Sequence, residues 1–187
     1  MTREQAWELL CEFVGADALR KHNMAVEAAM RHYAVILGGD VEQWGIAGLL
    51  HDFDYERWPN PPDHTREGAK VLRERGVDEE IVGAVLSHVD YNQDEYARDR
   101  PIRRALAAVD ELSSFIVACA LVRPTRLEGL TPKSVKKKMK ASAFAAAVNR
   151  DDIRAGAELL GIPLDEHISN CIAALEPVAA NLGLSLE

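Results

Sequence analysis

Most of this chain is divided into stretches with helical periodicity, and glycine, proline or a capping side chain marks the end of each stretch. In the first stretch, Trp7, Leu10 and Val14 recur at the spacing that places apolar side chains on one face of a helix. Thr2 and Gln5 precede them in the pattern of a capping box. No convincing alternation of apolar and polar residues, which would indicate a half-buried strand, interrupts this series. The sequence therefore predicts an all-α fold.

Capping residues and prolines set the bounds of the other predicted helices. Asp17 can cap a long helix that ends at Gly38, and Pro101 fits a first helical turn, where its missing amide donor is not needed. The segment Trp58–Pro62 contains three prolines and is predicted to be an ordered loop or lid. The predicted helices cover residues 2–14, 17–37, 40–52, 63–75, 78–89, 101–122, a basic segment from 131, 149–160 and 163–182.

Length and composition favour one globular domain. Of the 187 residues, 48% are hydrophobic and 28% charged, and a chain of this length buries roughly 70% of the surface that it exposes when unfolded. The longest apolar run, Phe115–Val122, is far shorter than the about 18 residues of a membrane-spanning helix. The first residues lack the basic and apolar regions of a secretion signal. We therefore expect a single domain over residues 1–187, without a membrane segment and located in the cytoplasm.

The charge distribution disfavours polymeric nucleic acid and membranes as partners. With 22 basic and 30 acidic side chains the net charge is −8, whereas both of these partners reward positive surfaces. One segment departs from this balance, because five lysines fall within residues 133–140. Its helix presents either a solvated face or a phosphate-binding surface formed by Lys133, Lys137 and Lys140, with Arg123 upstream as a further candidate. The oligomeric state cannot be inferred from the sequence.

Ionisable residues sit in two segments that are otherwise apolar. His51 and Asp52 follow the apolar stretch Trp44–Leu50, so both groups arrive at the buried end of a core helix. Leaving them unpaired there would cost several kcal/mol. A metal ion satisfies such a pair, because it offsets the carboxylate charge and accepts the imidazole lone pair. Asp110 lies in a similar helix and needs a metal, an arginine or a helix N-terminus as its partner.

The order of these residues resembles a known family. His22, the Leu-Leu-His-Asp sequence that ends in His51 and Asp52, and Asp110 look like the defining pattern of the HD-domain metal-dependent phosphohydrolases. The resemblance covers about residues 20–122. It implies an HD-domain bundle of roughly eight to ten helices, in which these four side chains hold one metal ion. The remainder of the chain is then a C-terminal helical extension, residues 123–187.

A second part of the pattern involves two more histidines. His64, followed by Gly68 at the fourth position, and then His88, are similar to the part of some HD families that holds a second metal. By this resemblance Asp52 bridges the two ions. His32 competes with His22 for the first ligand position, but it points to a different side of the helix, and we favour His22. His167 is predicted to be structural.

The chain also departs from the family pattern. Many relatives carry Ile-Gly-Lys after the His-Asp pair, whereas Phe53, Asp54 and Tyr55 follow it here, so the usual lysine near the substrate is missing. Asp54 and Glu56 add negative charge instead. They are candidates for an acid or base in catalysis, with support of a ligand or capping of the loop as their alternative roles.

The resemblance implies a cofactor and an activity. Histidine and carboxylate ligands without thiolate suit one or two ions of Mn, Fe, Co or Zn, and Mg less well. The activity would be hydrolysis of a small phosphate ester, with a nucleotide as one candidate, in which a metal-activated hydroxide attacks phosphorus and Asp52 holds both ions. Two alternatives are a di-iron oxygenase of the HD type and a non-catalytic protein that binds a metal or ligand, which the missing lysine motivates.

Overall fold

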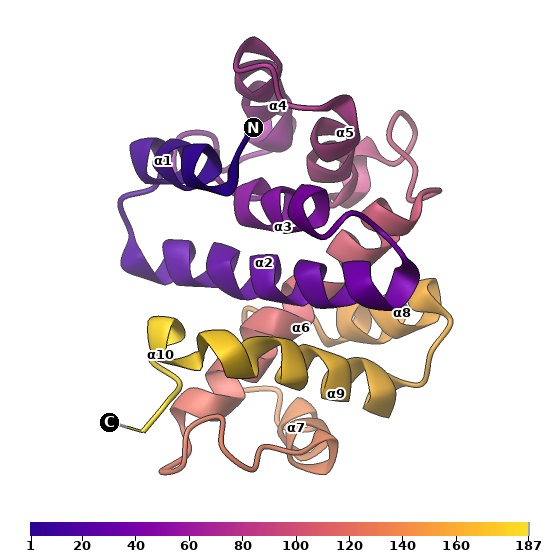
Figure 1. Cartoon of the computed structure of the whole chain (residues 1–187). Helices are drawn as coiled ribbons and strands as arrows, with labels where there is room; N and C mark the ends of the chain where they lie inside the picture. The colour runs from indigo at the N-terminus through magenta and orange to yellow at the C-terminus, as the bar shows by residue number, and fades with distance from the viewer. Residues whose placement is uncertain (187) are drawn as a thin grey trace.

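The computed structural model describes residues 1–186 and is helical, with no strand in this range (Figure 1). This confirms the predicted all-α fold. The α-helices are α1 (Arg3–Phe13), α2 (Asp17–Leu37), α3 (Val41–Leu50), α4 (Asp63–Glu74), α5 (Glu79–Ser87), α6 (Pro101–Leu121), α7 (Pro132–Met139), α8 (Arg150–Leu160), α9 (Leu164–Leu175) and α10 (Ala179–Leu182). Two short 3-10 helices, η1 (Asp90–Asn92) and η2 (Glu176–Val178), complete the set.

Helix α2 lies at the centre of the bundle. It packs against α3 on one side and against α6 and α9 on the other, while α8 packs on α6 (Figure 1). The core is formed by the buried apolar faces of these helices, and α3 is buried from Trp44 to Leu50. None of the helices within residues 1–186 has the length and apolarity needed to cross a bilayer.

The ends of the first two helices show which capping predictions were right. Thr2 and Gln5 form both bonds of the capping box, and Gly38 ends α2 in the left-handed conformation with φ 70°. Asp17 does not cap α2, because the cap position is Ala16, which has no side-chain acceptor. The carboxylate of Glu56 accepts hydrogen bonds from the backbone amides preceding α2 instead, at 2.8 Å from the nitrogen of Ala16.

The predicted helix 163–182 is wrong in its second half. Helix α9 ends at Leu175, and η2 then separates it from the short helix α10. Pro177 lies in η2 and explains the break, because it cannot donate the amide hydrogen bond that a continuous helix requires.

A buried polar contact joins α9 to α2 and α6. His167 is completely buried, with Nδ1 2.6 Å from the hydroxyl of Tyr33 and Nε2 3.0 Å from the carbonyl oxygen of Ala108. A carbonyl only accepts, so Nε2 carries the proton and Nδ1 accepts from the tyrosine. Burial lowers the pKa of His167 to about 4, and the imidazole is therefore neutral. This agrees with its predicted structural role.

This histidine makes stability depend on pH. Between about pH 6.5 and pH 4 the unfolded chain binds a proton at His167 that the native state does not, so the free energy of unfolding falls as the pH falls. We expect His167→Gln to lower stability at pH 7 but to remove about 2 kcal/mol of the loss between pH 7 and pH 5. Urea unfolding at both pH values measures this. His32→Gln is the control, and an unchanged pH dependence in His167→Gln would contradict the account.

Candidate metal centre

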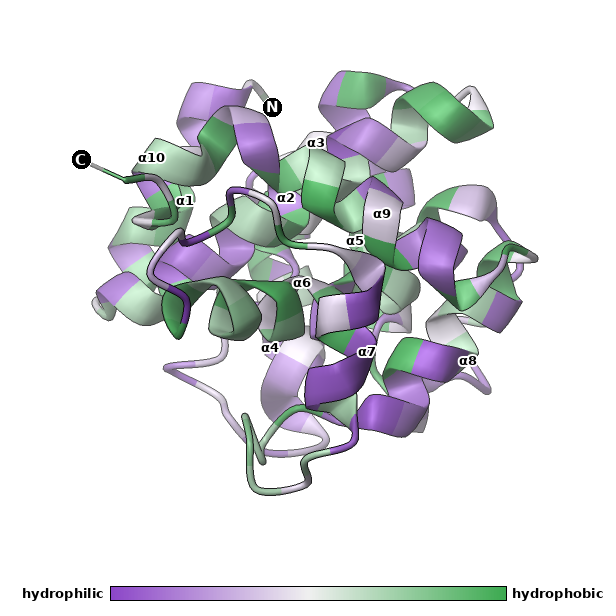
Figure 2. Ribbon diagram, turned by 90° about the horizontal axis from the view of Figure 1, so that it is seen from below, coloured by the Kyte–Doolittle hydropathy of each residue, from purple (hydrophilic) through white to green (hydrophobic). Residues whose placement is uncertain are grey.

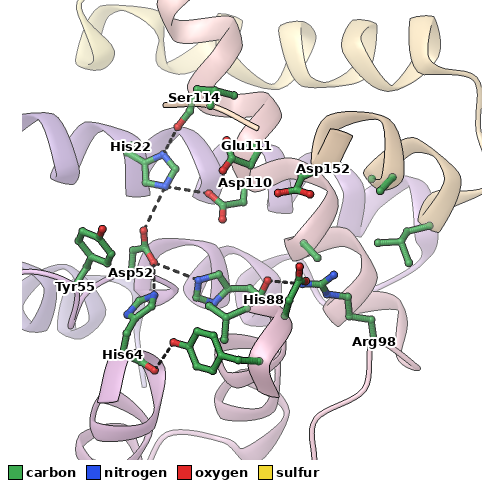
Figure 3. A pocket seen from close by; sticks show the side chains of 18 of the residues that line it. His22, Asp52, Tyr55, His64, His88, Arg98, Asp110, Glu111, Ser114 and Asp152 are labelled. Atoms are coloured by element: carbon green, nitrogen blue, oxygen red, sulfur yellow. Dashed lines mark hydrogen bonds and ion pairs between the residues drawn. The ribbon is translucent and has the colours of Figure 1, made fainter. Parts of the chain in front are cut away.

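Four histidines and two aspartates from five segments of the chain meet at one place, with Asp52 between the imidazoles of His22 and His64 (Figure 3). The segments are α2, the end of α3, the start of α4, the end of α5 and the middle of α6. The residues are His22, His51, Asp52, His64, His88 and Asp110. The structure thus brings together every residue that the sequence pattern proposed as a metal ligand.

Two short apolar helices place a histidine at the same position relative to their ends. After a polar first turn, helices α3 and α5 are apolar and buried, and they end at Leu50 and Ser87. His51 and His88 directly follow these ends. A helix that is apolar all round must lie in the interior, so each carries its terminal histidine inward.

The first group of donor atoms surrounds Nε2 of His22. That nitrogen lies 3.0 Å from Nε2 of His51, 3.2 Å from Oδ1 of Asp110 and 3.8 Å from Oδ2 of Asp52. Nε2 of His51 in turn lies 3.4 Å from Oδ1 of Asp110 and 3.7 Å from Oδ2 of Asp52. Two imidazoles and two carboxylates therefore face a common point.

The second group shares Asp52 with the first. Its other carboxylate oxygen, Oδ1, lies 3.3 Å from Nε2 of His64 and 3.3 Å from Nε2 of His88. One oxygen of Asp52 thus faces each group. This is the arrangement of a carboxylate that bridges two ions.

The far side of each imidazole is held by a neighbour. Nδ1 of His51 lies 2.8 Å from the carbonyl oxygen of Gly48, and Nδ1 of His88 lies 2.7 Å from that of Val85. Nδ1 of His22 contacts the Ser114 hydroxyl at 2.9 Å, and Nδ1 of His64 contacts Oδ1 of Asp54 at 3.1 Å. A partner on Nδ1 is what orients a metal-binding histidine, because it leaves the Nε2 lone pair for the metal.

These donor atoms fit a divalent metal ion. His51 donates its Nδ1 proton to a carbonyl, so its Nε2 presents a lone pair to Nε2 of His22 at 3.0 Å, a contact that requires a proton or a cation between them. Ligand atoms about 2.1 Å from one ion lie about 3 Å from each other, as the atoms of both groups do. Nitrogen and carboxylate donors suit Mn, Fe, Co or Zn. The donor set accommodates one or two divalent ions.

The pKa values of the histidines and aspartates in the two groups also indicate that the site attracts positive charge. Burial by itself lowers the pKa of His51, but the negative charges of Asp52 and Asp110 outweigh it and raise the value to about 9. In His64, burial again lowers the pKa, whereas hydrogen bonds to Asp52 and Asp54 raise it. The resulting pKa is about 9. Burial raises the pKa of Asp52 and Asp110, but the charge of His51 and the hydrogen bonds from neighbouring histidines together outweigh it and lower both values. The carboxylates remain ionised in the interior.

Asp54 is not placed to act as an acid or base. Its side chain is completely buried and accepts hydrogen bonds from the amides of Thr65 at 2.8 Å and Gly68 at 3.1 Å, besides its contact with His64. These contacts match support of a ligand, one of the alternative roles, and speak against the predicted acid or base role. The sequence could not show this, because Asp54 lies in a run of turns where no periodicity fixes its direction.

Glu56 also lies away from the reacting groups. Its carboxylate accepts from the amides of Gly15 and Ala16, both at 2.8 Å, and so caps the N-terminus of α2. This contact matches capping of the loop, the other alternative role, and speaks against the acid or base role for this residue as well. The predicted lid 58–62 does not line the cavity, and Trp58 packs against Phe13 instead.

A cavity of about 520 Å³ opens onto the two groups (Figure 3). Beyond the metal donors, its polar lining includes Tyr55, Arg98, Glu111, Ser114 and Asp152. Burial, together with the charge of the neighbouring Asp110, raises the pKa of Glu111 to about 7. Sequence reasoning missed these lining residues. Glu111 adjoins Asp110 in an apolar helix and could have been suspected, but Arg98 and Asp152 lie outside any pattern.

The predicted phosphate-binding residues are not at this cavity. Lys133, Lys137, Lys140 and Arg123 are absent from its lining, and α7 packs against α9 and α6 with a hydrophilic outer side (Figure 2). Arg123 donates to the Thr125 hydroxyl and to a backbone carbonyl nearby. For the lysines of α7, this position favours the alternative of a solvated helix face. A run of charged residues shows that one face of a helix is polar, but it does not show which part of the protein that face meets.

Comparison with known proteins identifies the family. The sequence-family model for the HD domain matches residues 19–115, so the chain belongs to the HD-domain family. This family includes metal-dependent phosphohydrolases. A crystal structure of the HD domain of the L. monocytogenes phosphodiesterase PgpH is similar at 16% sequence identity, covering 91% of this chain and 98% of that chain with a TM-score of 0.49. No curated protein matches the chain.

The packing of Gly68 against Asp54 can be tested. A Cβ atom on Gly68 would lie 2.5 Å from Oδ2 of Asp54, a side chain that its three hydrogen bonds prevent from moving aside. We expect Gly68→Ala to lower the free energy of unfolding by about 1–3 kcal/mol and to weaken metal binding through His64. Denaturant unfolding and metal analysis measure the two effects. Gly15→Ala serves as the control, because the nearest atom to its added Cβ would be 3.6 Å away. Wild-type stability and metal content in Gly68→Ala would contradict the expectation.

Proposed function

We propose that this protein is a metal-dependent phosphohydrolase that acts on a small phosphate ester. The observation that carries the proposal is the pair of donor groups, His22–His51–Asp52 and Asp52–His64–His88, which share one carboxylate and face one cavity. Membership in the HD-domain family supports the same class of reaction.

Each group would hold one divalent ion. His22, His51 and Asp110 would bind the first, His64 and His88 the second, and Asp52 both. Ions at such a centre lower the pKa of water toward neutrality and stabilise charge on a transferring phosphoryl group. The chain's own contribution is to hold the donors in place, through the contacts on each Nδ1 atom.

The cavity restricts the size and charge of the substrate. Its volume of about 520 Å³ lies within the range of small-molecule sites. Arg98 is its only basic lining residue apart from the histidines within residues 1–186, whereas Asp90 and Asp152 add negative charge and Glu111, with a pKa of about 7, is partly ionised at neutral pH. A phosphate ester with few negative charges would suit this lining. The apolar part of the wall, from Ala107, Val148, Ala155 and Leu159, would contact the rest of the molecule.

The cavity is lined both by the metal-binding core and by the C-terminal extension. Asp110 and Glu111 belong to α6, while Asp152, Ala155 and Gly156 belong to α8 in the C-terminal extension. We therefore propose that residues 1–187 act as one domain, with the extension closing the substrate cavity.

Replacing the shared carboxylate tests the proposal most simply. We expect Asp52→Ala to lose bound metal and to lower phosphate release by at least about 100-fold, while its helical circular dichroism persists. Metal analysis and a panel of phosphomonoesters and phosphodiesters with added Mn²⁺ measure this. Asp165→Ala, on the exposed side of α9, is the control. Full activity in Asp52→Ala, or iron-dependent oxygen consumption without phosphate release by the wild type, would contradict the proposal.

The lysines of α7 provide a second test. Because none of them lines the cavity, we expect Lys137→Ala to leave both KM and kcat within about twofold of wild type for every ester that the panel identifies, since long-range charges are screened by salt. Steady-state kinetics at about 0.15 M salt measure this. An increase of KM without a change of kcat would show that α7 contacts the substrate.

A further inference from the structure

A buried asparagine links the two histidine-bearing segments of the second group. Asn92, at the end of η1, is completely buried. Its Nδ2 donates to the Thr65 hydroxyl at 2.9 Å and to the carbonyl oxygen of Leu86 at 3.0 Å. Thr65 directly follows His64, and Leu86 precedes His88 by two residues. One carboxamide therefore fixes the separation of the two segments.

The segment on the His64 side needs such a support. Thr65 has φ 66° and ψ −36°, in the left-handed region that β-branched residues avoid. Its amide donates to Asp54, its hydroxyl accepts from Asn92, and the hydroxyl of Tyr91 donates to the carbonyl oxygen of His64 at 2.9 Å. These three contacts hold the turn in this unfavourable conformation, and the turn places His64 inside the second group.

The first group contains a matching asparagine. Asn23 directly follows His22 in α2 and is completely buried. Its Nδ2 donates to the carbonyl oxygen of Leu49 at 3.0 Å, and Leu49 precedes His51 by two residues. Its Oδ1 has no hydrogen-bond partner in the part of the chain that the structure describes. A buried amide oxygen without a partner lowers stability, so general stabilisation does not explain this residue.

The two asparagines make the same connection in the two groups. Asn23 directly follows His22, and Asn92 binds Thr65, which directly follows His64. Each asparagine also donates to the carbonyl oxygen of the residue two positions before the other histidine of its group. We propose that Asn23 and Asn92 are positioning residues, one for each metal ion, with Asn92 setting the second ion site and Asn23 the first. The inference rests on the proposed two-ion centre.

Metal titration tests this assignment independently of activity. Metal-depleted protein is titrated with Mn²⁺ in competition with a chromophoric chelator. We expect two ions in the wild type and, in Asn92→Ala, a loss of affinity of about 10- to 100-fold for one ion, with the other within about twofold. Asn170→Ala, which removes an asparagine in contact with Tyr33 far from both groups, should bind both ions normally.

Combination with His88→Ala identifies which ion is affected. His88→Ala should retain only the first ion, so adding Asn92→Ala should leave the affinity for that ion unchanged. Adding Asn23→Ala to His88→Ala should weaken it. The inference is overturned if Asn92→Ala binds both ions like the wild type, weakens both equally, or weakens the ion that His88→Ala retains.

A second variant covers the case in which Asn92→Ala does not fold. Thr65→Val keeps the β-branched shape but removes the hydroxyl that accepts from Asn92. It should weaken the binding of the same ion to a smaller degree, with unchanged circular dichroism and a Tm lowered by only a few degrees in the metal-free state. Wild-type binding of both ions by Thr65→Val overturns the inference. If the wild type itself binds fewer than two ions, the proposed two-ion centre fails, and the inference fails with it.

Discussion

The carboxylate of Asp52 is the contact on which the candidate site depends. It is a charged group with only 18% of its side chain exposed, and its two oxygens lie 3.3 to 3.8 Å from four imidazoles. A buried charge of this kind persists only when it is compensated. The convergence of five chain segments on this point is therefore a requirement of the chemistry as much as a result of packing. The same requirement accounts for the polar contact that holds the Nδ1 atom of each of the four histidines.

The helical architecture supplies this convergence with short elements. Helices α3 and α5 are apolar and buried, and each ends one residue before a histidine. Helices α2 and α6 run alongside and add His22 and Asp110. The fourth histidine, His64, enters differently, from a strained turn that Asp54 and Asn92 hold. The second group thus depends on side-chain contacts more than the first does.

Much of this was predictable from the sequence because it follows from periodicity. The helices and most of their ends could be predicted, since apolar faces determine which side of a helix turns inward. The six converging side chains were predicted from the resemblance of their order to the HD-domain pattern. For Asp54, Glu56 and the lysines of α7, the contacts favour the alternative roles over the catalytic and phosphate-binding ones. Their directions depend on turns and on neighbouring helices, which the residue pattern does not encode. Asn23 and Asn92 could not be recognised at all, because an amide acquires its role only from the carbonyl opposite to it.

The most direct measurement of the central claim is a crystal structure of the Mn²⁺-loaded protein with anomalous scattering data. The account predicts two anomalous peaks, one on each side of the Asp52 carboxylate and each contacted by two of the four histidines. A single peak that does not touch Asp52, or ions bound only at surface carboxylates, would contradict it.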